Sequence, residues 1–220
     1  MTIDWRVKVF DFGAGIYGYL VAQDVWERAN TALVRHFPEP TKRICDLGCG
    51  TGATVIAEAR ACPGAEIVGV DISAPMIARA EAALAACERP IRDRVRVIVG
   101  DAAHLPFEDE SFDVVTGHSF LYLVPHRAEV LREVVRVLRP GGRAVFMEPR
   151  RGSFSPRALL ALGKDPRFLA SMTLWRIAAR MNVRFTEQTL PALLAEAGLQ
   201  PLAADPVLGG LGLIAAAEKT

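Results

Sequence analysis

Asp46, Asp71 and Asp101 each lie at or near the end of a short apolar run. Runs of this length are typical of buried parallel strands. Open α/β sheets bind their ligands at the carboxyl ends of such strands, so we expect the three carboxylates to lie at one edge of a sheet. A carboxylate at that edge can accept hydrogen bonds from the hydroxyl groups of a ribose. The chemistry indicated is recognition of a nucleotide-type ligand.

A glycine-rich turn follows Asp46 directly. Gly48, Gly50 and Gly52 stand at alternate positions. Glycine has no Cβ and tolerates positive φ, so these positions suit a backbone that turns sharply and comes close to something bulky. Asp71 lies about 20 residues beyond the turn, a spacing that fits one βαβ unit whose second strand ends at a ribose. The carboxylate of Asp71 could bind both ribose hydroxyls and would repel a 2′-phosphate.

The glycine spacing separates two classes of nucleotide-type ligand. Dinucleotide-binding turns carry G-x-G-x-x-G, whereas this chain carries Asp46-x-Gly48-x-Gly50-x-Gly52. That run resembles motif I of the class I S-adenosylmethionine-dependent methyltransferases. Two more segments are similar to motifs of the family, Gly100-Asp101-Ala102-Ala103-His104-Leu105-Pro106-Phe107 and Leu138-Arg139-Pro140-Gly141-Gly142. The resemblance spans roughly residues 10–150 and is to the ubiquinone/menaquinone biosynthesis-like branch, methyltransferase type 11.

The resemblance implies a binding site for S-adenosyl-L-methionine, which leaves as S-adenosyl-L-homocysteine. In this family the glycine loop wraps the amino-acid end of the cofactor. Asp101 would accept from the adenine amine, with the Ala102 amide facing the ring nitrogens. Tyr17 belongs to a segment, Phe10-Asp11-x-x-Ala14-x-x-Tyr17, that is similar to the family's entry segment, although Phe10 replaces the usual tyrosine. The implied cofactor contacts are Tyr17, Asp46, Gly48, Cys49, Gly50, Asp71, Ile72, Met76, Asp101, Ala102 and His118.

No nucleophile–base–acid set stands out in the sequence. The sulfonium of the cofactor already activates its methyl group, so an in-line displacement needs mainly the correct position of the acceptor. A base is needed only if the acceptor is protonated at the working pH. The weak candidates for such a base are His118, Tyr122, His126 and Glu148. The histidines do not show metal-ligand spacing with nearby acids, so no metal is expected.

The order of the segments predicts an α/β fold with a Rossmann-like, doubly wound sheet. Five strands are expected at 43–47, 67–71, 95–99, 112–116 and 143–148, followed by a closing pair at 199–204 and 211–217. Helices are expected at 51–61, 75–86 and 126–138, and from Thr186 onward. The resemblance implies seven strands, mostly parallel, with the last strand antiparallel.

The chain is expected to form one methyltransferase domain over residues 1–220. Residues 1–40 would form a helical N-terminal cap, 41–148 the cofactor-binding core, and 186–220 the closing helix and strand pair. Residues 149–185 combine arginines with large apolar side chains and are expected to be a helical insertion over the acceptor site. Two alternatives for this insertion are an ordinary surface helix and a basic amphipathic helix that rests on a membrane surface.

The composition limits the classes of partner and the cellular location that we expect for this protein. The 220 residues are 51% hydrophobic and carry a net charge of +1, so no overall field points to nucleic acid. Residues 117–123 lack the (N/D/S)-P-P-(Y/F) tetrapeptide of methyltransferases that act on nucleic-acid or glutamine nitrogens. The four cysteines lack C-x-x-C spacing and are expected to be reduced and buried. With no signal-peptide pattern and no apolar run of membrane length, we expect a cytoplasmic protein.

The leading hypothesis is methyl transfer to a small, fairly apolar molecule. A quinone-precursor ring carbon, a lipid headgroup amine, and an oxygen or nitrogen of a secondary metabolite would all fit as acceptors. An oxidoreductase of the NAD type should carry a Tyr-x-x-x-Lys pair, but Tyr122 is followed four residues later by His126. A cofactor-binding protein without catalysis would carry the same binding motifs, and it stays open as an alternative.

Overall fold

The computed structural model describes residues 24–152, 160–163 and 165–220. Tyr17, one of the implied cofactor contacts, lies outside these residues. The strands are β1 (Arg43–Leu47), β2 (Glu66–Asp71), β3 (Val95–Val99), β4 (Phe112–His118), β5 (Leu138–Pro149), β6 (Gln200–Val207) and β7 (Gly212–Glu218). The helices are α2 (Asp24–Val34), α3 (Ala53–Ala61), α4 (Ala74–Ala85), α5 (Arg89–Arg92), α6 (Arg127–Val137), α8 (Pro166–Met181) and α9 (Thr189–Glu196). A 3-10 turn, η1, spans Leu208–Gly210.

All seven strands form one sheet in the order β3-β2-β1-β4-β5-β7-β6. The first five strands pair in parallel. The last strand, β7, is antiparallel to both β5 and β6. The Rossmann-like sheet predicted from the sequence, mostly parallel with an antiparallel last strand, is therefore confirmed.

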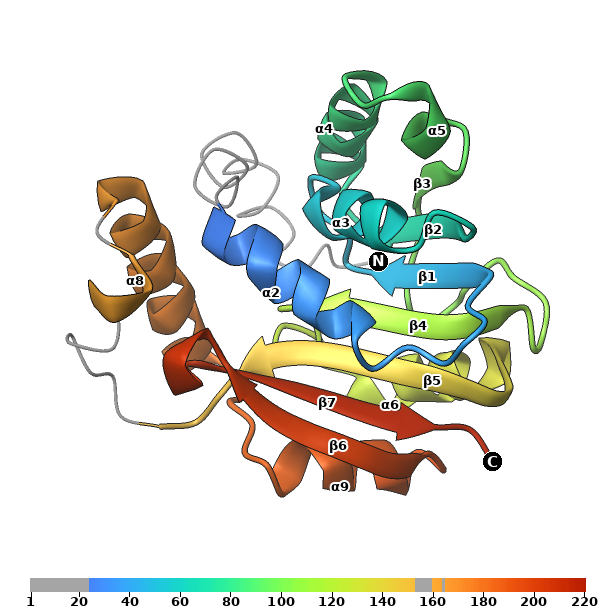
Figure 1. Ribbon diagram of the computed structural model, residues 1–220. Helices are drawn as coiled ribbons and strands as arrows, with labels where there is room; N and C mark the ends of the chain where they lie inside the picture. The colour runs from blue at the N-terminus through green and yellow to red at the C-terminus, as the bar shows by residue number, and fades with distance from the viewer. Residues whose placement is uncertain (1–23, 153–159, 164) are drawn as a thin grey trace.

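Helices cover both faces of the sheet, so each face has its own apolar core (Figure 1). One core joins the sheet to α6 and α9 through residues such as Val134 and Leu194. The other joins it to α2, α3, α4 and α8 through residues such as Leu33 and Met172. The central strand β1 is almost fully buried, as expected for a parallel strand covered on both sides.

Several boundaries differ from the predicted ones. The predicted helix at 126–138 ends at Val137, because Leu138 already pairs with Phe112 as the first residue of β5. The predicted strand at 112–116 continues to His118, which pairs with Met147. The last helix begins at Thr189, and Thr186 instead accepts a hydrogen bond from the Thr189 amide at 3.1 Å.

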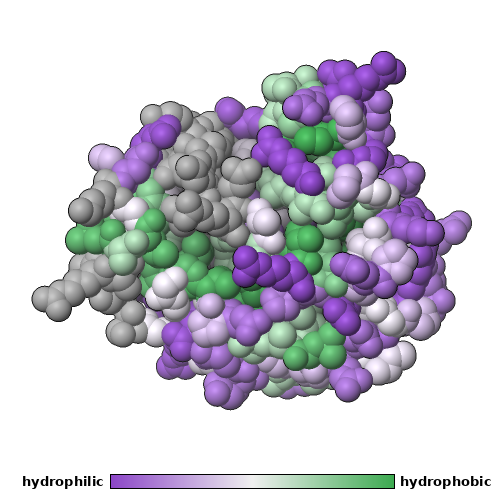
Figure 2. Space-filling view, in the orientation of Figure 1, coloured by the Kyte–Doolittle hydropathy of each residue, from purple (hydrophilic) through white to green (hydrophobic). Residues whose placement is uncertain are grey.

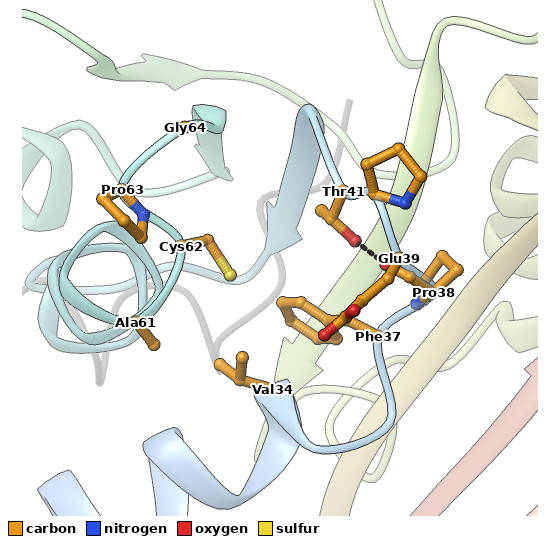
Figure 3. A pocket seen from close by; sticks show the side chains of 10 residues that line it. Val34, Phe37, Pro38, Glu39, Thr41, Ala61, Cys62, Pro63 and Gly64 are labelled. Atoms are coloured by element: carbon orange, nitrogen blue, oxygen red, sulfur yellow. Dashed lines mark hydrogen bonds between the residues drawn. The ribbon is translucent and has the colours of Figure 1, made fainter.

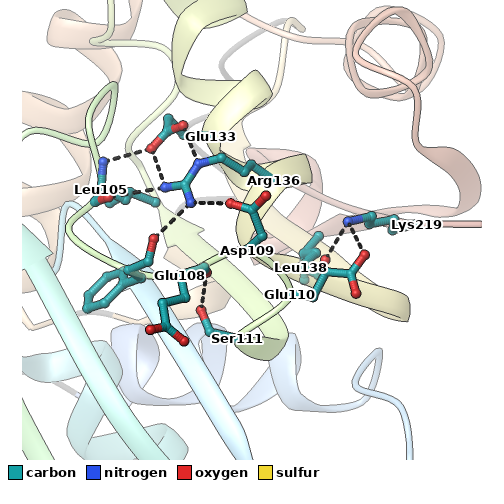
Figure 4. Close-up of polar contacts among 10 residues, drawn as sticks. Leu105, Glu108, Asp109, Glu110, Ser111, Glu133, Arg136, Leu138 and Lys219 are labelled. Atoms are coloured by element: carbon teal, nitrogen blue, oxygen red, sulfur yellow. Dashed lines mark hydrogen bonds and ion pairs between the residues drawn. The ribbon is translucent and has the colours of Figure 1, made fainter.

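An ion-pair network fixes the segment that follows Asp101 (Figure 4). The guanidinium of Arg136 in α6 binds both carboxylate oxygens of Glu133 at 2.7 Å and Asp109 at 2.8 Å. It also donates to the carbonyl of Leu105 at 3.1 Å, while Glu133 accepts from the Leu105 amide at 2.9 Å. This two-sided attachment holds the loop between β3 and β4 against α6.

In the part of the chain that the structure describes, no helix combines the length and the apolar character needed to cross a bilayer. The cytoplasmic location stays a prediction.

Candidate active site

The strand order reverses at β1, which has β2 on one side and β4 on the other. In open α/β sheets the crevice outside the carboxyl ends of the strands at such a point is where ligands bind. The predicted residues Asp46, Asp71, Asp101 and His118 come at or just after the carboxyl ends of β1, β2, β3 and β4, respectively. The fold therefore brings the predicted acids to one edge of the sheet, as expected.

The glycine turn is fastened to the end of β2. Gly48 and Gly50 have φ of 68° and 52°, in the left-handed region where glycine is favoured. The Gly48 amide donates to the Val70 carbonyl at 2.8 Å, and the Gly50 amide donates to Oδ2 of Asp71 at 2.9 Å. The turn and the carboxylate are thus held in one arrangement.

The space around Gly48 differs from the space around Gly50. A Cβ on Gly48 would come within 2.5 Å of Cδ2 of Phe120, so the ring of Phe120 packs directly on this position. Among the described residues a Cβ on Gly50 would meet only the Gly48 carbonyl, at 3.9 Å, so none of them fills the space beside Gly50. One side of the turn is therefore packed by protein, and the other can receive a ligand.

Asp71 and Asp101 are held by the backbone that follows each of them. Oδ1 of Asp71 accepts from the Ser73 amide at 2.9 Å. Oδ1 of Asp101 accepts from the Ala103 amide at 2.9 Å, and Oδ2 lies 3.5 Å from Nδ1 of the exposed His104. Asp71 is partly buried and Asp101 is exposed. These bonds orient the two carboxylates and leave lone pairs for further hydrogen bonds.

Exposed apolar side chains stand beside these acids. Ile72 is 56% exposed and Val99 is 55% exposed, which is unusual in a chain whose other apolar strand residues are mostly buried. Val99 pairs with Asp71 in the sheet, so the two apolar side chains come from adjacent strand ends. Met76, in contrast, is only 3% exposed, and Ala102 is partly buried. The edge offers an apolar surface next to hydrogen-bond acceptors.

Asp46 is fully buried and belongs to an acid pair that the sequence analysis missed. The Thr116 hydroxyl lies 3.1 Å from Oδ1 of Asp46 and 2.8 Å from Oε1 of Glu58. Burial raises the pKa of Asp46 to about 7, and burial together with the charge of Asp46 raises the pKa of Glu58 well above its ordinary value. A hydroxyl has one hydrogen to donate, so the second contact fits a protonated Glu58. The available signal was Glu58 itself, a lone carboxylate in the apolar α3.

The four candidate bases are dispersed in different environments. Burial lowers the pKa of His118 to about 4, so its imidazole is neutral at neutral pH. Tyr122 is 4% exposed and packs in the core. His126 is exposed at the start of α6. Burial raises the pKa of Glu148 to about 8 against the lowering effect of three backbone amides, and both of its oxygens accept from these amides. This arrangement argues against a base role for Glu148.

Helix α8, within the predicted insertion, touches the loop that follows β4. Nε1 of Trp175 donates to the Ser119 hydroxyl at 2.9 Å. Ser119 has φ of 56°, which is uncommon for a residue with a Cβ and is often found at functional sites. The buried Arg176 donates to the carbonyls of Arg150 at 2.8 Å and Leu211 at 3.2 Å. These bonds attach α8 to the site edge and to the ends of β5 and β7.

A separate cavity of about 570 Å³ lies between the loop before β1 and the loop before β2 (Figure 3). Its walls include Phe37, Thr41, Cys62 and Gly64. Because these residues precede strands, the cavity is at the amino ends of the strands, on the opposite edge from the acids. It is not part of the candidate site.

Comparisons with known proteins agree with this geometry. A family model described as "Methyltransferase domain" matches residues 45–146. The chain is 43% identical over 107 residues to a demethylmenaquinone methyltransferase of Lactiplantibacillus plantarum, covering 48% of this chain and 44% of that relative. It is 41% identical over 142 residues to nocamycin O-methyltransferase of Saccharothrix syringae, covering 64% and 50%. The chain thus spans about half the length of these relatives.

A solved structure shares the fold over nearly the whole chain. The SAM-dependent methyltransferase from Aquifex aeolicus superposes with a TM-score of 0.72 and 14% identity, covering 94% of this chain and 98% of that one. Likeness at this identity shows the fold alone. Residues 45–146 match the methyltransferase-domain family, and the sequence is similar to methyltransferases of the menaquinone branch, as the motifs of the S-adenosylmethionine-dependent class predicted.

Proposed function

We propose that this chain transfers the methyl group of S-adenosylmethionine to a small apolar, aromatic or lipid-like molecule. The observation that carries the proposal is the glycine turn held on Asp71, with the space beside Gly50 left unfilled by the described residues. A carboxylate at this position suits the two hydroxyls of a ribose, and it opposes a phosphate at the same place. The match of residues 45–146 to the methyltransferase-domain family supports S-adenosylmethionine as the methyl donor.

The described side chains fit an adenosine at this edge. The exposed Ile72 and Val99 would give a flat base apolar contacts, and Asp101 would accept from its exocyclic amine. The Ala102 amide would face the ring nitrogens. Met76 is buried at the start of α4 and would support the base from within the protein. Cys49 is part of the turn itself. Asp46, which lies two residues before Gly48, would help to hold the turn in place through its bond with Thr116.

When bound, the cofactor supplies an activated methyl group. The residues of the chain then have to bind and orient two molecules and exclude water, which can contribute several kcal/mol to lowering the barrier. With a pKa of about 4, His118 would hold a proton weakly, so it suits contact with the cofactor better than proton transfer. Catalysis by positioning needs no base from this set.

The acceptor would lie beside the loop after β4, below the insertion. The Trp175–Ser119 bond brings α8 to that loop, and this supports the proposal that residues 149–185 form a wall of the acceptor site. The curated relatives are named for demethylmenaquinone and nocamycin. Quinone-like molecules and small molecules with a hydroxyl group are therefore the first acceptors to test.

Titration calorimetry with S-adenosylhomocysteine and with NAD tests the cofactor. We expect the first to bind and the second not to bind, and the reverse result would overturn the proposal. A methyl-transfer assay with a labelled donor over a panel of quinones, amines and hydroxylated aromatics tests the reaction. Cofactor binding without transfer to any member of the panel would favour a non-catalytic role.

A further inference from the structure

Residues 120–124 make a short turn whose amides bind one side chain and whose carbonyls bind another. The Leu123 amide donates to the Phe120 carbonyl at 3.0 Å, and the Val124 amide donates to the Leu121 carbonyl at 3.2 Å. Like the start of a helix, such a turn leaves its first amides without a partner inside the turn. These amides need an acceptor from elsewhere in the fold because the segment is largely buried.

Glu148 in β5 supplies that acceptor. Its Oε1 accepts from the amides of Phe120 at 3.1 Å and Leu121 at 2.7 Å, and its Oε2 accepts from the amide of Tyr122 at 3.1 Å. The residue is fully buried. Three amides donate to one carboxyl group, so the hydrogen bonds of Glu148 fix the backbone of this turn.

Arg127 completes the arrangement from the other side. Its Nε donates to the Leu121 carbonyl at 2.7 Å, and its Nη2 donates to the Tyr122 carbonyl at 3.3 Å. The amides of the turn therefore meet an acidic side chain and its carbonyls meet a basic one. An acceptor therefore lies at the amide end of the turn and a donor at its carbonyl end, as at the two ends of a capped helix.

The fixed turn reaches both halves of the candidate site. Phe120 packs on Gly48 in the glycine turn. The preceding Ser119 binds Trp175 of α8 through its hydroxyl, and its amide donates to the Met147 carbonyl at 2.7 Å. Residues 119–124 thus link the turn of the proposed cofactor site to the proposed wall of the acceptor site.

We infer that Glu148 is a positioning residue, which holds residues 119–124 so that Phe120 supports the glycine turn and Ser119 receives α8. The inference rests on the proposed function, because it assigns the loop to the boundary between cofactor and acceptor. Glu148 acts through the loop backbone and not on the reacting atoms.

Amide hydrogen exchange followed by NMR tests this role directly. In Glu148→Ala the amides of Phe120, Leu121 and Tyr122 should exchange at least about tenfold faster, since each loses a bond to a buried carboxyl group. In Glu148→Gln the side-chain oxygen can still accept from the amides of Phe120 and Leu121, but the side-chain amide group faces the Tyr122 amide. The exchange rate of the Tyr122 amide should therefore increase most. The milder variant also covers the case in which the alanine variant does not fold.

Glu58→Gln is the matched control, because Glu58 is equally buried and makes no recorded contact with residues 119–124. This variant should leave the three amides at wild-type exchange rates. Unchanged rates at Phe120, Leu121 and Tyr122 in both Glu148 variants would overturn the inference. Equal acceleration throughout β1 and β2 would also overturn it, because that result indicates a purely global loss of stability.

Calorimetry with S-adenosylhomocysteine separates this inference from the proposed function. Glu148→Ala should weaken binding at least about fivefold, through the loss of support for the glycine turn. If the wild-type protein does not bind the probe, the proposed function fails, whatever the exchange rates are. If the wild type binds it and the loop amides exchange faster in Glu148→Ala with no change in affinity, the positioning role fails and the proposed function stands.

Discussion

Replacing Glu58 by glutamine should reduce the loss of folding stability that occurs as the pH rises. Burial and the neighbouring charge of Asp46 raise the pKa of Glu58. Near neutral pH this carboxyl group therefore keeps its proton in the folded chain, whereas it is ionised in the unfolded chain. Glutamine resembles the protonated acid in size and keeps an oxygen for Thr116. Its amide group can also donate to Oδ2 of Asp46, which has no hydrogen-bond partner among the described residues.

The magnitude follows from proton linkage. A group whose pKa is raised on folding contributes stability that is fully present below its unfolded pKa, near 4.5 for Glu58, and lost as the pH rises toward the folded value. One proton bound only in the folded state changes the free energy of unfolding by about 1.4 kcal/mol per pH unit. Between pH 5 and pH 7 the wild type should therefore lose stability relative to Glu58→Gln, at a rate of at most about 1.4 kcal/mol per pH unit.

Urea denaturation of both proteins at each pH unit from pH 3 to pH 8, followed by circular dichroism, measures this difference. Glu133→Gln provides a control of opposite sign, because hydrogen bonds from Arg136 lower the pKa of Glu133. Its contribution is present above the unfolded pKa and lost as the pH falls through the folded value. If the free energies of unfolding of wild type and Glu58→Gln change in parallel with pH, the buried proton assigned to Glu58 does not exist.

Three further substitutions test the site. Asp71→Ala removes the proposed ribose acceptor and should weaken S-adenosylhomocysteine binding at least roughly tenfold in calorimetry. The control Asp205→Ala, at the far edge of the sheet, should bind with wild-type affinity. Equal affinities of the two variants would refute the ribose assignment. Gly48→Val places a Cβ at 2.5 Å from Phe120 on a backbone with φ of +68° and should abolish binding, and wild-type affinity would show that this turn is not the cradle. Trp175→Phe keeps the ring but loses the hydrogen bond to Ser119, so urea denaturation should show a loss of about 1 kcal/mol, and no measurable loss would contradict a stabilising bond.

The curated relatives agree with the branch that the sequence motifs indicated and the solved structure agrees with the fold, but they leave the acceptor to experiment. Identity to the relatives covers about half of each relative, and the family model ends at residue 146. The segments that follow, which include α8, are the ones expected to contact the acceptor. If these segments form the acceptor site, as we propose, substrate choice depends on the part of the chain that follows the matched family model.

The sequence by itself determined the sheet and the position of its binding edge. Short apolar runs, each followed by a turn or helix pattern, leave few alternatives to a parallel sheet, because strand and helix periods are local properties of the chain. The glycine positions were equally predictable, since Gly48 and Gly50 have the positive φ that only their lack of a Cβ makes favourable. Asp71 and Asp101 could be placed for the same reason, as Asp71 ends β2 and Asp101 lies two residues after the end of β3.

Only the tertiary structure decided which buried polar groups meet. Glu58, Thr116 and Asp46 are far apart in the sequence, and their contact depends on α3 packing over β1 and β4. The same holds for Glu148, which looked like a candidate base but binds three amides of the loop after β4. A carboxyl group has the same sequence signature whether it faces a ligand or a backbone amide, and only the folded packing distinguishes the two.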